Sequence, residues 1–146
     1  MTDTARKTAT VRVTRRYAAS PERVFDAWLD PKVAAKFLFA TPTGQMIRAE
    51  TDPRVGGAFV FVDRRPDMGD VEHVGTYLEI DRPRRLVFEF AVPKYERQKT
   101  RVAIDIEPDG DGARLTLTHE GVFEEWVTRT EHGWGMILDA LGKALG

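Results

Sequence analysis

The sequence predicts an α+β fold in which a curved antiparallel sheet of about six or seven strands wraps around a long C-terminal helix. Three observations lead to this prediction. Several segments alternate apolar and polar side chains, the period-two pattern of half-buried strands. Short links join these segments, and short links require antiparallel pairing because parallel strands need long crossovers. The segment from Phe123 to Leu145 places its apolar residues at steps of three and four, the spacing of an amphipathic helix.

The N-terminal part of the pattern is a strand followed by two short helices. Thr10–Ala18 alternates and is expected to form the strand. Ser20 is suited to cap the first helix, because its hydroxyl can accept a hydrogen bond from a free backbone N–H, and Pro21 fits the first helical position. Asp30 and Pro31 repeat this arrangement and therefore predict a second short helix.

The central part of the chain supplies the remaining strands. They are expected at Gln45–Glu50, Ala58–Arg65, His73–Asp81, Arg85–Ala91, Lys99–Glu107 and Ala113–Glu120. In the long helix, Gly133 and Gly135 predict a bend or a close backbone contact, since glycine disfavours a helix interior. The sequence has no recognisable linker or repeat. We therefore expect a flexible tail at residues 1–9 and one domain at residues 10–146.

The composition excludes several functional classes. The chain has 146 residues, and its 22 Lys and Arg nearly balance its 23 Asp and Glu, so that the formal net charge is -1. This balance argues against nucleic acid or an anionic membrane as a partner. There is no cysteine, which excludes disulfides and thiolate metal sites. No signal peptide and no membrane-spanning run is visible, and we expect a cytoplasmic location.

Motifs for metal, cofactor or nucleophilic chemistry are missing from the sequence. His73, His119 and His132 are the only histidines, and none pairs with another at the spacing of a zinc site. No Gly-x-Ser-x-Gly elbow, phosphate loop or dinucleotide motif occurs. We therefore expect no metal and no cofactor. Asp63 and Asp105 are expected on the solvated outer face of the sheet.

A cavity between sheet and helix is the expected ligand site, because one helix does not fill the concave face of a wide, bent sheet. Apolar walls with a few polar groups are typical of ligand pockets. Strand parity and the helical stripe give the candidate ligand-binding residues Trp28, Phe59, Phe61, Tyr77, Phe88, Phe90, Leu117, His119, Trp134, Ile137 and Leu138. Each of the apolar residues could equally belong to an ordinary core. The face occupied by Tyr77 stays open.

His119 is the candidate catalytic residue. It continues the parity of Leu115 and Leu117, so that its imidazole is expected to point toward the same apolar face. A titratable group among apolar walls can act as an acid, a base or a hydrogen-bond partner of a ligand. The alternative is a structural histidine at the end of a strand, bonded to backbone or to a carboxylate such as that of Glu120.

The order of several short motifs resembles that of a known family. The motifs are Ser20-Pro21-Glu22-Arg23-Val24-Phe25-Asp26-Ala27-Trp28-Leu29-Asp30-Pro31, Val55-Gly56-Gly57-Ala58-Phe59, Gly75–Asp81 with Pro83–Phe88, Leu115–Gly121, and Gly133-Trp134. Together they resemble the AHSA-type branch (activator of Hsp90 ATPase homologues) of the START-like, SRPBCC superfamily, from about Val11 to Leu145. The resemblance implies a helix-grip fold, as in birch-pollen-allergen-like proteins, with an internal cavity for a small apolar ligand.

Three functions are compatible with this resemblance, because a fold does not by itself determine an activity. The first is a carrier or sensor that binds a small apolar molecule, with no catalysis. The second is an enzyme of the polyketide cyclase or hydrolase kind that uses His119. The third is a co-chaperone-like interaction module, which we rank last. A homodimer is a further expectation, because Val60, Val62 and Val87 would leave apolar surface on the outer face of the sheet.

Overall fold

A computed structural model describes residues 7–146, and these form one seven-stranded antiparallel sheet and three α-helices. The elements in chain order are β1 (Thr8–Tyr17), α1 (Pro21–Leu29), α2 (Pro31–Ala34), β2 (Gln45–Thr51), β3 (Ala58–Arg65), β4 (Gly69–Asp81), β5 (Arg85–Val92), β6 (Glu96–Asp109), β7 (Gly112–Phe123), the 3₁₀ turn η1 (Glu124–Trp126) and α3 (Val127–Leu145). The strand order is β1-β7-β6-β5-β4-β3-β2, so that β1 and β2 are the two edges.

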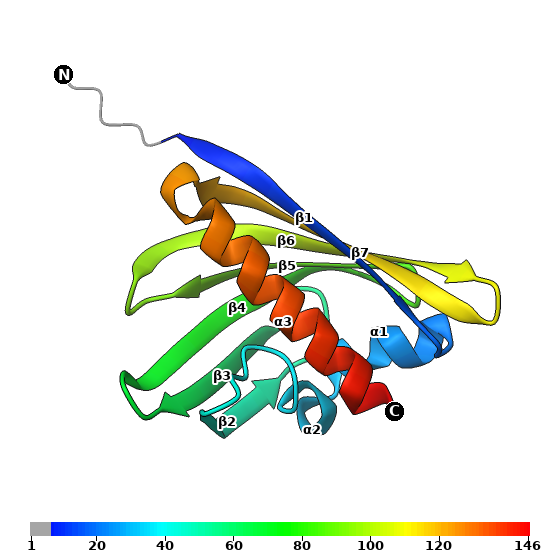
Figure 1. The fold of residues 1–146 in the computed structure, drawn as a ribbon, viewed down its shortest axis with the longest axis horizontal. Helices are drawn as coiled ribbons and strands as arrows, with labels where there is room; N and C mark the ends of the chain where they lie inside the picture. The colour runs from blue at the N-terminus through cyan, green and yellow to red at the C-terminus, as the bar shows by residue number, and fades with distance from the viewer. Residues whose placement is uncertain (1–6) are drawn as a thin grey trace.

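The long helix α3 crosses one face of the curved sheet diagonally (Figure 1). It runs from the β1 and β7 edge toward α1 and α2, which lie near its C-terminal end. The core lies between these helices and the concave face, and it is built from strand residues of one parity together with Trp134, Leu138 and Leu141 of α3. The predicted helix-grip fold class is confirmed.

The two predicted helix starts are also confirmed. The backbone N–H of Arg23 donates to the Ser20 hydroxyl over 3.2 Å, and Pro21 is the first residue of α1. The backbone N–H of Lys32 donates to the Asp30 carboxylate over 2.9 Å at the start of α2. These side chains satisfy backbone donors that have no partner inside a helix.

The long helix begins later in the chain than the sequence pattern predicted, so that prediction is corrected. The sequence pattern placed Phe123 on its apolar stripe, but Phe123 is the last residue of β7 and pairs with Thr8 of β1. The helix itself begins at Val127, after η1. Strand pairing prevails here because β1 extends far enough to bond the end of β7, and local periodicity contains no information about that partner.

The N-terminal edge strand begins earlier than expected. Thr8 and Ala9 already belong to β1, whereas residues 1–6 of the expected tail lie outside the described residues.

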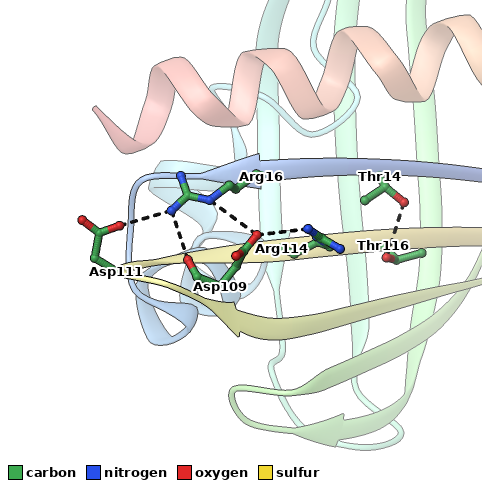
Figure 2. A network of polar contacts seen from close by, with 6 residues as sticks. All are labelled: Thr14, Arg16, Asp109, Asp111, Arg114 and Thr116. Carbon is green, nitrogen blue, oxygen red and sulfur yellow. Dashed lines mark hydrogen bonds and ion pairs between the residues drawn. The ribbon is translucent and has the colours of Figure 1, made fainter.

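At the other end of β1, the Arg16 guanidinium donates to the Asp109 carbonyl over 3.0 Å and to the Asp111 carboxylate over 3.2 Å (Figure 2). This exposed network ties the end of β1 to the turn between β6 and β7.

The prediction for Asp63 was wrong. This residue was expected on the solvated outer face of the sheet, but it lies in the interior. It shares the parity of Phe59 and Phe61, and its side chain is fully buried. The Thr41 hydroxyl donates to Asp63 Oδ2 over 2.8 Å, and Arg65 Nε donates to the same atom over 3.0 Å. The carboxylate therefore anchors the loop before β2.

Across residues 7–146, no helix is long and apolar enough to span a membrane.

Candidate functional site

A cavity of about 260 Å³ opens between the N-terminal half of α3 and the concave face of the sheet. Its residues come from the neighbouring strands β5, β6 and β7, from the turn between β5 and β6, and from α3 with its preceding turn. His73 of β4 and Phe39 of the loop between α2 and β2 complete the wall. The volume lies just below the roughly 300 to 1,000 Å³ of typical ligand pockets. It suits a molecule of one or two rings.

The walls of the cavity are mainly aromatic and aliphatic. Phe90 and Trp134 face each other edge to face, with ring centroids 6.2 Å apart. Trp126, Ile137 and Val122 add further apolar surface. Such walls contribute binding free energy by removing the apolar surface of a ligand from water.

Phe39 contributes to the wall from an unusual backbone conformation. Its φ of 60° lies in the left-handed region, which a bulky residue seldom adopts. The ring stacks on His73 with centroids 4.2 Å apart, and it also contacts Phe90 and Trp134 at 5.1 and 6.0 Å. These contacts hold the residue in a conformation that costs free energy by itself.

A directed chain of hydrogen bonds reaches the cavity through His119. The indole Nε1–H of Trp134 donates to His119 Nδ1 over 3.0 Å. His119 Nε2 lies 2.7 Å from the Thr100 hydroxyl oxygen. Because an indole N–H can only donate, Nδ1 must carry the lone pair and Nε2 must carry the proton. The imidazole therefore donates to the Thr100 oxygen.

This arrangement decides what His119 can do chemically. Burial lowers its pKa from 6.5 to about 4, so the imidazole is neutral at pH 7. Its only lone pair already accepts the Trp134 N–H, so it has no free site for a substrate proton. In this geometry His119 orients Thr100 rather than serving as a general base.

His73 is the second buried histidine at the cavity. Only 6% of its surface is exposed, and its Nδ1 has no hydrogen-bond partner among the described residues. Burial, assisted by the positive charge of Arg65, lowers its pKa to about 4, so it is also neutral at pH 7. A buried polar atom without a partner costs free energy. The ring of His73 therefore contributes to the cavity wall while its Nδ1 stays shielded from it.

Glu96, Gln98 and Thr100 of β6 share one parity and form a polar strip along the cavity. Glu96 lies nearest the β5–β6 turn, and Thr100 lies next to His119. No Lys or Arg lines the cavity within the described chain. The site is therefore apolar, with hydrogen-bonding groups and one carboxylate.

The structure divides the residues that the sequence predicted for the ligand site. Phe90, His119, Trp134 and Ile137 line the cavity. The others, Trp28, Phe59, Phe61, Tyr77, Phe88, Leu117 and Leu138, are buried in the adjoining core instead. Tyr77 lies on the concave face, where burial raises the pKa of its hydroxyl. Tertiary packing fills that part of the groove with the loop containing Phe39 and with neighbouring rings.

The sequence analysis did not single out Thr100, His73 or Phe39. His73 could have been found, because it continues the parity of Val71 and Tyr77 on β4, both of which are buried. Thr100 lies on the same strand face as Val102 and Ile104, which also gives a usable signal. Phe39 lies in a stretch without periodicity, and no sequence pattern indicates where it packs.

Within residues 7–146, no group of three His, Asp or Glu side chains is arranged to hold a metal ion. The donor set of the cavity suits an organic ligand better than a cation.

Comparison with known proteins adds the family. Residues 18–146 match the Activator of Hsp90 ATPase homolog 1-like proteins, which is most of the chain. The chain belongs to this family. That membership agrees with the SRPBCC resemblance of the sequence motifs. No curated protein matches the chain significantly.

Solved structures of similar proteins support the same fold. Protein CV1439 from Chromobacterium violaceum is 28% identical with a TM-score of 0.85, and the match covers 93% of this chain and 96% of that one. Mll3558 from Rhizobium loti is 25% identical with a TM-score of 0.81, over 97% and 99% of the two chains. The AHSA1-like protein from Aeromonas hydrophila is 20% identical with a TM-score of 0.81, over 94% and 92%, which supports the fold alone.

Proposed function

We propose that the protein binds a small apolar molecule in the cavity between α3 and the sheet, as a carrier or sensor. The observation that carries this proposal is an aromatic cavity of about 260 Å³ with the Thr100 hydroxyl, held by His119, at its wall. Core packing would normally close such a space, because interiors are close-packed. Family membership supports the proposal, since proteins of this fold generally bind small hydrophobic ligands.

Catalysis by His119 is the weaker hypothesis. It requires a lone pair that can accept a proton from the substrate, and the Trp134 N–H occupies the one lone pair of the neutral ring. Freeing Nδ1 would break a buried hydrogen bond. A chaperone-directed role has no specific support among the described residues, and we do not propose it.

Self-association is a separate matter from ligand binding. Val60, Val62 and Val87 were expected to leave apolar surface on the outer sheet face, but Val60 is only partly exposed and Val62 and Val87 are 8% and 4% exposed within one chain. Two of the three valines are thus buried within one chain, so this face gives little support to a homodimer. A cytoplasmic location fits the proposal and is part of it.

A pair of glycine variants tests the ligand site. Gly133 lines the cavity, on the same helical face as Thr130 and Ile137, and a Cβ atom there would meet open space. Gly133→Leu should therefore project a side chain into the cavity and weaken binding about tenfold or more, through steric overlap with the ligand. Gly135 is absent from the cavity wall, so Gly135→Leu is the matched control and should retain affinity.

The measurement is a thermal-shift titration with a panel of uncharged aromatic compounds of one and two rings. A ligand that binds the native state raises the unfolding midpoint as its concentration rises. At a ligand concentration of about a hundred times Kd, the free energy of unfolding increases by about 2.7 kcal/mol. A midpoint that no compound shifts would refute the proposed function. Equal shifts in Gly133→Leu and the wild type would place the binding site elsewhere.

A further inference from the structure

The hydroxyl of Thr100 ends the hydrogen-bond chain as a donor. Its oxygen accepts the His119 Nε2–H over 2.7 Å, so the hydroxyl hydrogen must point toward another acceptor. No such acceptor is present among the described residues, although Thr100 lies at the cavity wall. Trp134 and His119 thus fix the direction of this donor, because reversing the chain would require the indole nitrogen to accept.

The charges around the cavity are uneven. The titratable side chains that line it are Glu96, Tyr95, His73 and His119, and both histidines are neutral at pH 7. No Lys or Arg from the described elements lines the wall, so an anionic ligand would have no countercharge and would face Glu96. Burying a carboxylate without a countercharge is costly, even where a hydroxyl group donates to it.

A cationic ligand meets a different mismatch. Glu96 precedes Thr100 by four residues on β6, roughly 13 Å along an extended strand. An ammonium group beside Glu96 would leave the Thr100 hydroxyl, at the inner end of the polar strip, without a partner. An ammonium group at the inner wall would approach the Thr100 donor and two neutral imidazoles, and no carboxylate lines the cavity there.

Resting on the proposed function, we propose that the cavity selects uncharged aromatic ligands with a hydrogen-bond acceptor, such as a carbonyl oxygen, that bonds the Thr100 hydroxyl. Thr100 is the specificity-determining residue. Trp134 and His119 are positioning residues that hold its oxygen in the accepting role toward His119. Aromatic ketones and esters fit this description, and carboxylates of the same shape do not.

Four naphthalene probes of similar size test the selection on the wild-type protein. They are 2-acetonaphthone (neutral acceptor), 2-ethylnaphthalene (no polar group), 2-naphthoate (anion) and 1-(2-naphthyl)ethylamine (cation). We expect 2-acetonaphthone to bind most tightly at neutral pH, and 2-ethylnaphthalene to bind roughly two- to tenfold more weakly for want of one hydrogen bond. Binding is followed by quenching of tryptophan fluorescence, since Trp126 and Trp134 line the cavity.

Variants at the polar strip identify the residues responsible. Thr100→Val should lower the affinity for 2-acetonaphthone to that for 2-ethylnaphthalene, and Thr100→Ser, which keeps the hydroxyl, should restore it. Glu96→Gln should strengthen 2-naphthoate binding and leave 2-acetonaphthone unaffected. If Thr100→Val does not fold, the comparison of the four probes on the wild type still decides the matter.

A spectroscopic measurement tests the positioning role independently of any ligand. Nitrogen NMR of the imidazole at neutral pH should show His119 with an unprotonated Nδ1 and a protonated Nε2. In Trp134→Phe the indole donor is absent, so the proton should no longer be confined to Nε2. The opposite tautomer in the wild type would overturn the inference. Tighter binding of the anion or the cation than of the ketone would also overturn it, while leaving the proposed function intact. Failure of all four probes to bind would refute both.

Discussion

At the scale of single residues, the environment of each polar side chain decides its role. His119 and His132 are the same residue type, but His119 is buried between Trp134 and Thr100 whereas His132 is exposed on α3. Strand parity predicted the face of His119 correctly, since it points into the apolar side with Leu117. Its partners come from α3 and β6, and no local pattern could name them.

The two buried histidines predict a pH dependence of stability. Their native pKa is about 4, against 6.5 for an unperturbed imidazole, because burial disfavours the charged form. As the pH falls from 6.5 toward 4, the unfolded chain takes up protons that the native state does not. The free energy of unfolding should therefore fall, by up to about 1.4 kcal/mol per pH unit for each histidine.

Urea unfolding at about pH 7.5 and about pH 5.5 measures this effect above the range in which carboxylates titrate. The double variant His73→Phe with His119→Gln removes both imidazoles and should show a much smaller difference between the two conditions. Phe at position 73 preserves the ring that stacks on Phe39. An unchanged pH difference in this variant would contradict the assignment.

At the scale of elements, α3 combines an apolar core face with glycines that serve different purposes. A Cβ at Gly133 would meet nothing within 4 Å, because the cavity lies there. A Cβ at Gly135 would lie 3.2 Å from an Arg15 guanidinium nitrogen, and Arg15 pairs with Asp139. The neighbour at Gly135 is thus a side chain of β1, and not the close backbone contact that the sequence analysis gave as one alternative.

These surroundings predict different effects of alanine on stability. Gly133→Ala should raise the free energy of unfolding by up to about 1 kcal/mol, since alanine favours the helix and no neighbour must move. Gly135→Ala should gain less, because the methyl group displaces Arg15 from an exposed ion pair that contributes little. Chemical denaturation of both variants checks the order, and a larger gain at Gly135 would contradict it.

At the scale of the whole molecule, the attachment of α3 to the sheet defines both the core and the cavity. The Tyr17 hydroxyl of β1 donates to the Leu138 carbonyl of α3 over 2.7 Å, in a buried contact that joins distant parts of the chain. The C-terminal half of the helix packs into the core through Leu138 and Leu141. The N-terminal half packs on the core through Trp134 and Val127, and it also supplies Thr130, Gly133 and Ile137 to the cavity wall.

The Tyr17 contact predicts a measurable contribution to global stability. Tyr17→Phe keeps the ring and removes the hydroxyl, so the free energy of unfolding should fall by about 1 kcal/mol. Tyr95→Phe is the matched control, because its hydroxyl donates to Met68 Sδ on the exposed side and should contribute much less. Equal losses in the two variants would show that the buried bond has no special weight.

The sequence alone determined the order of the elements, the sheet class and the two helix caps. These features depend on local patterns: the alternation of strands, the periodicity of helices, and Ser-Pro or Asp-Pro at helix N-termini. Such patterns involve only residues that are close together in the sequence. It also determined that Phe90, His119, Trp134 and Ile137 belong to the inner face. Parity selects a face, and the face is shared by core and cavity.

Only the tertiary structure decided which inner residues are core and which line the cavity. Phe39 packs against Phe59 and Phe61, which are absent from the cavity wall, and also against Phe90 and Trp134, which border the cavity. The buried Asp63 and the Trp134–His119–Thr100 chain likewise join residues from separate elements. Contacts of this kind depend on the distances between packed elements, and the spacing of residues along the sequence contains no information about those distances.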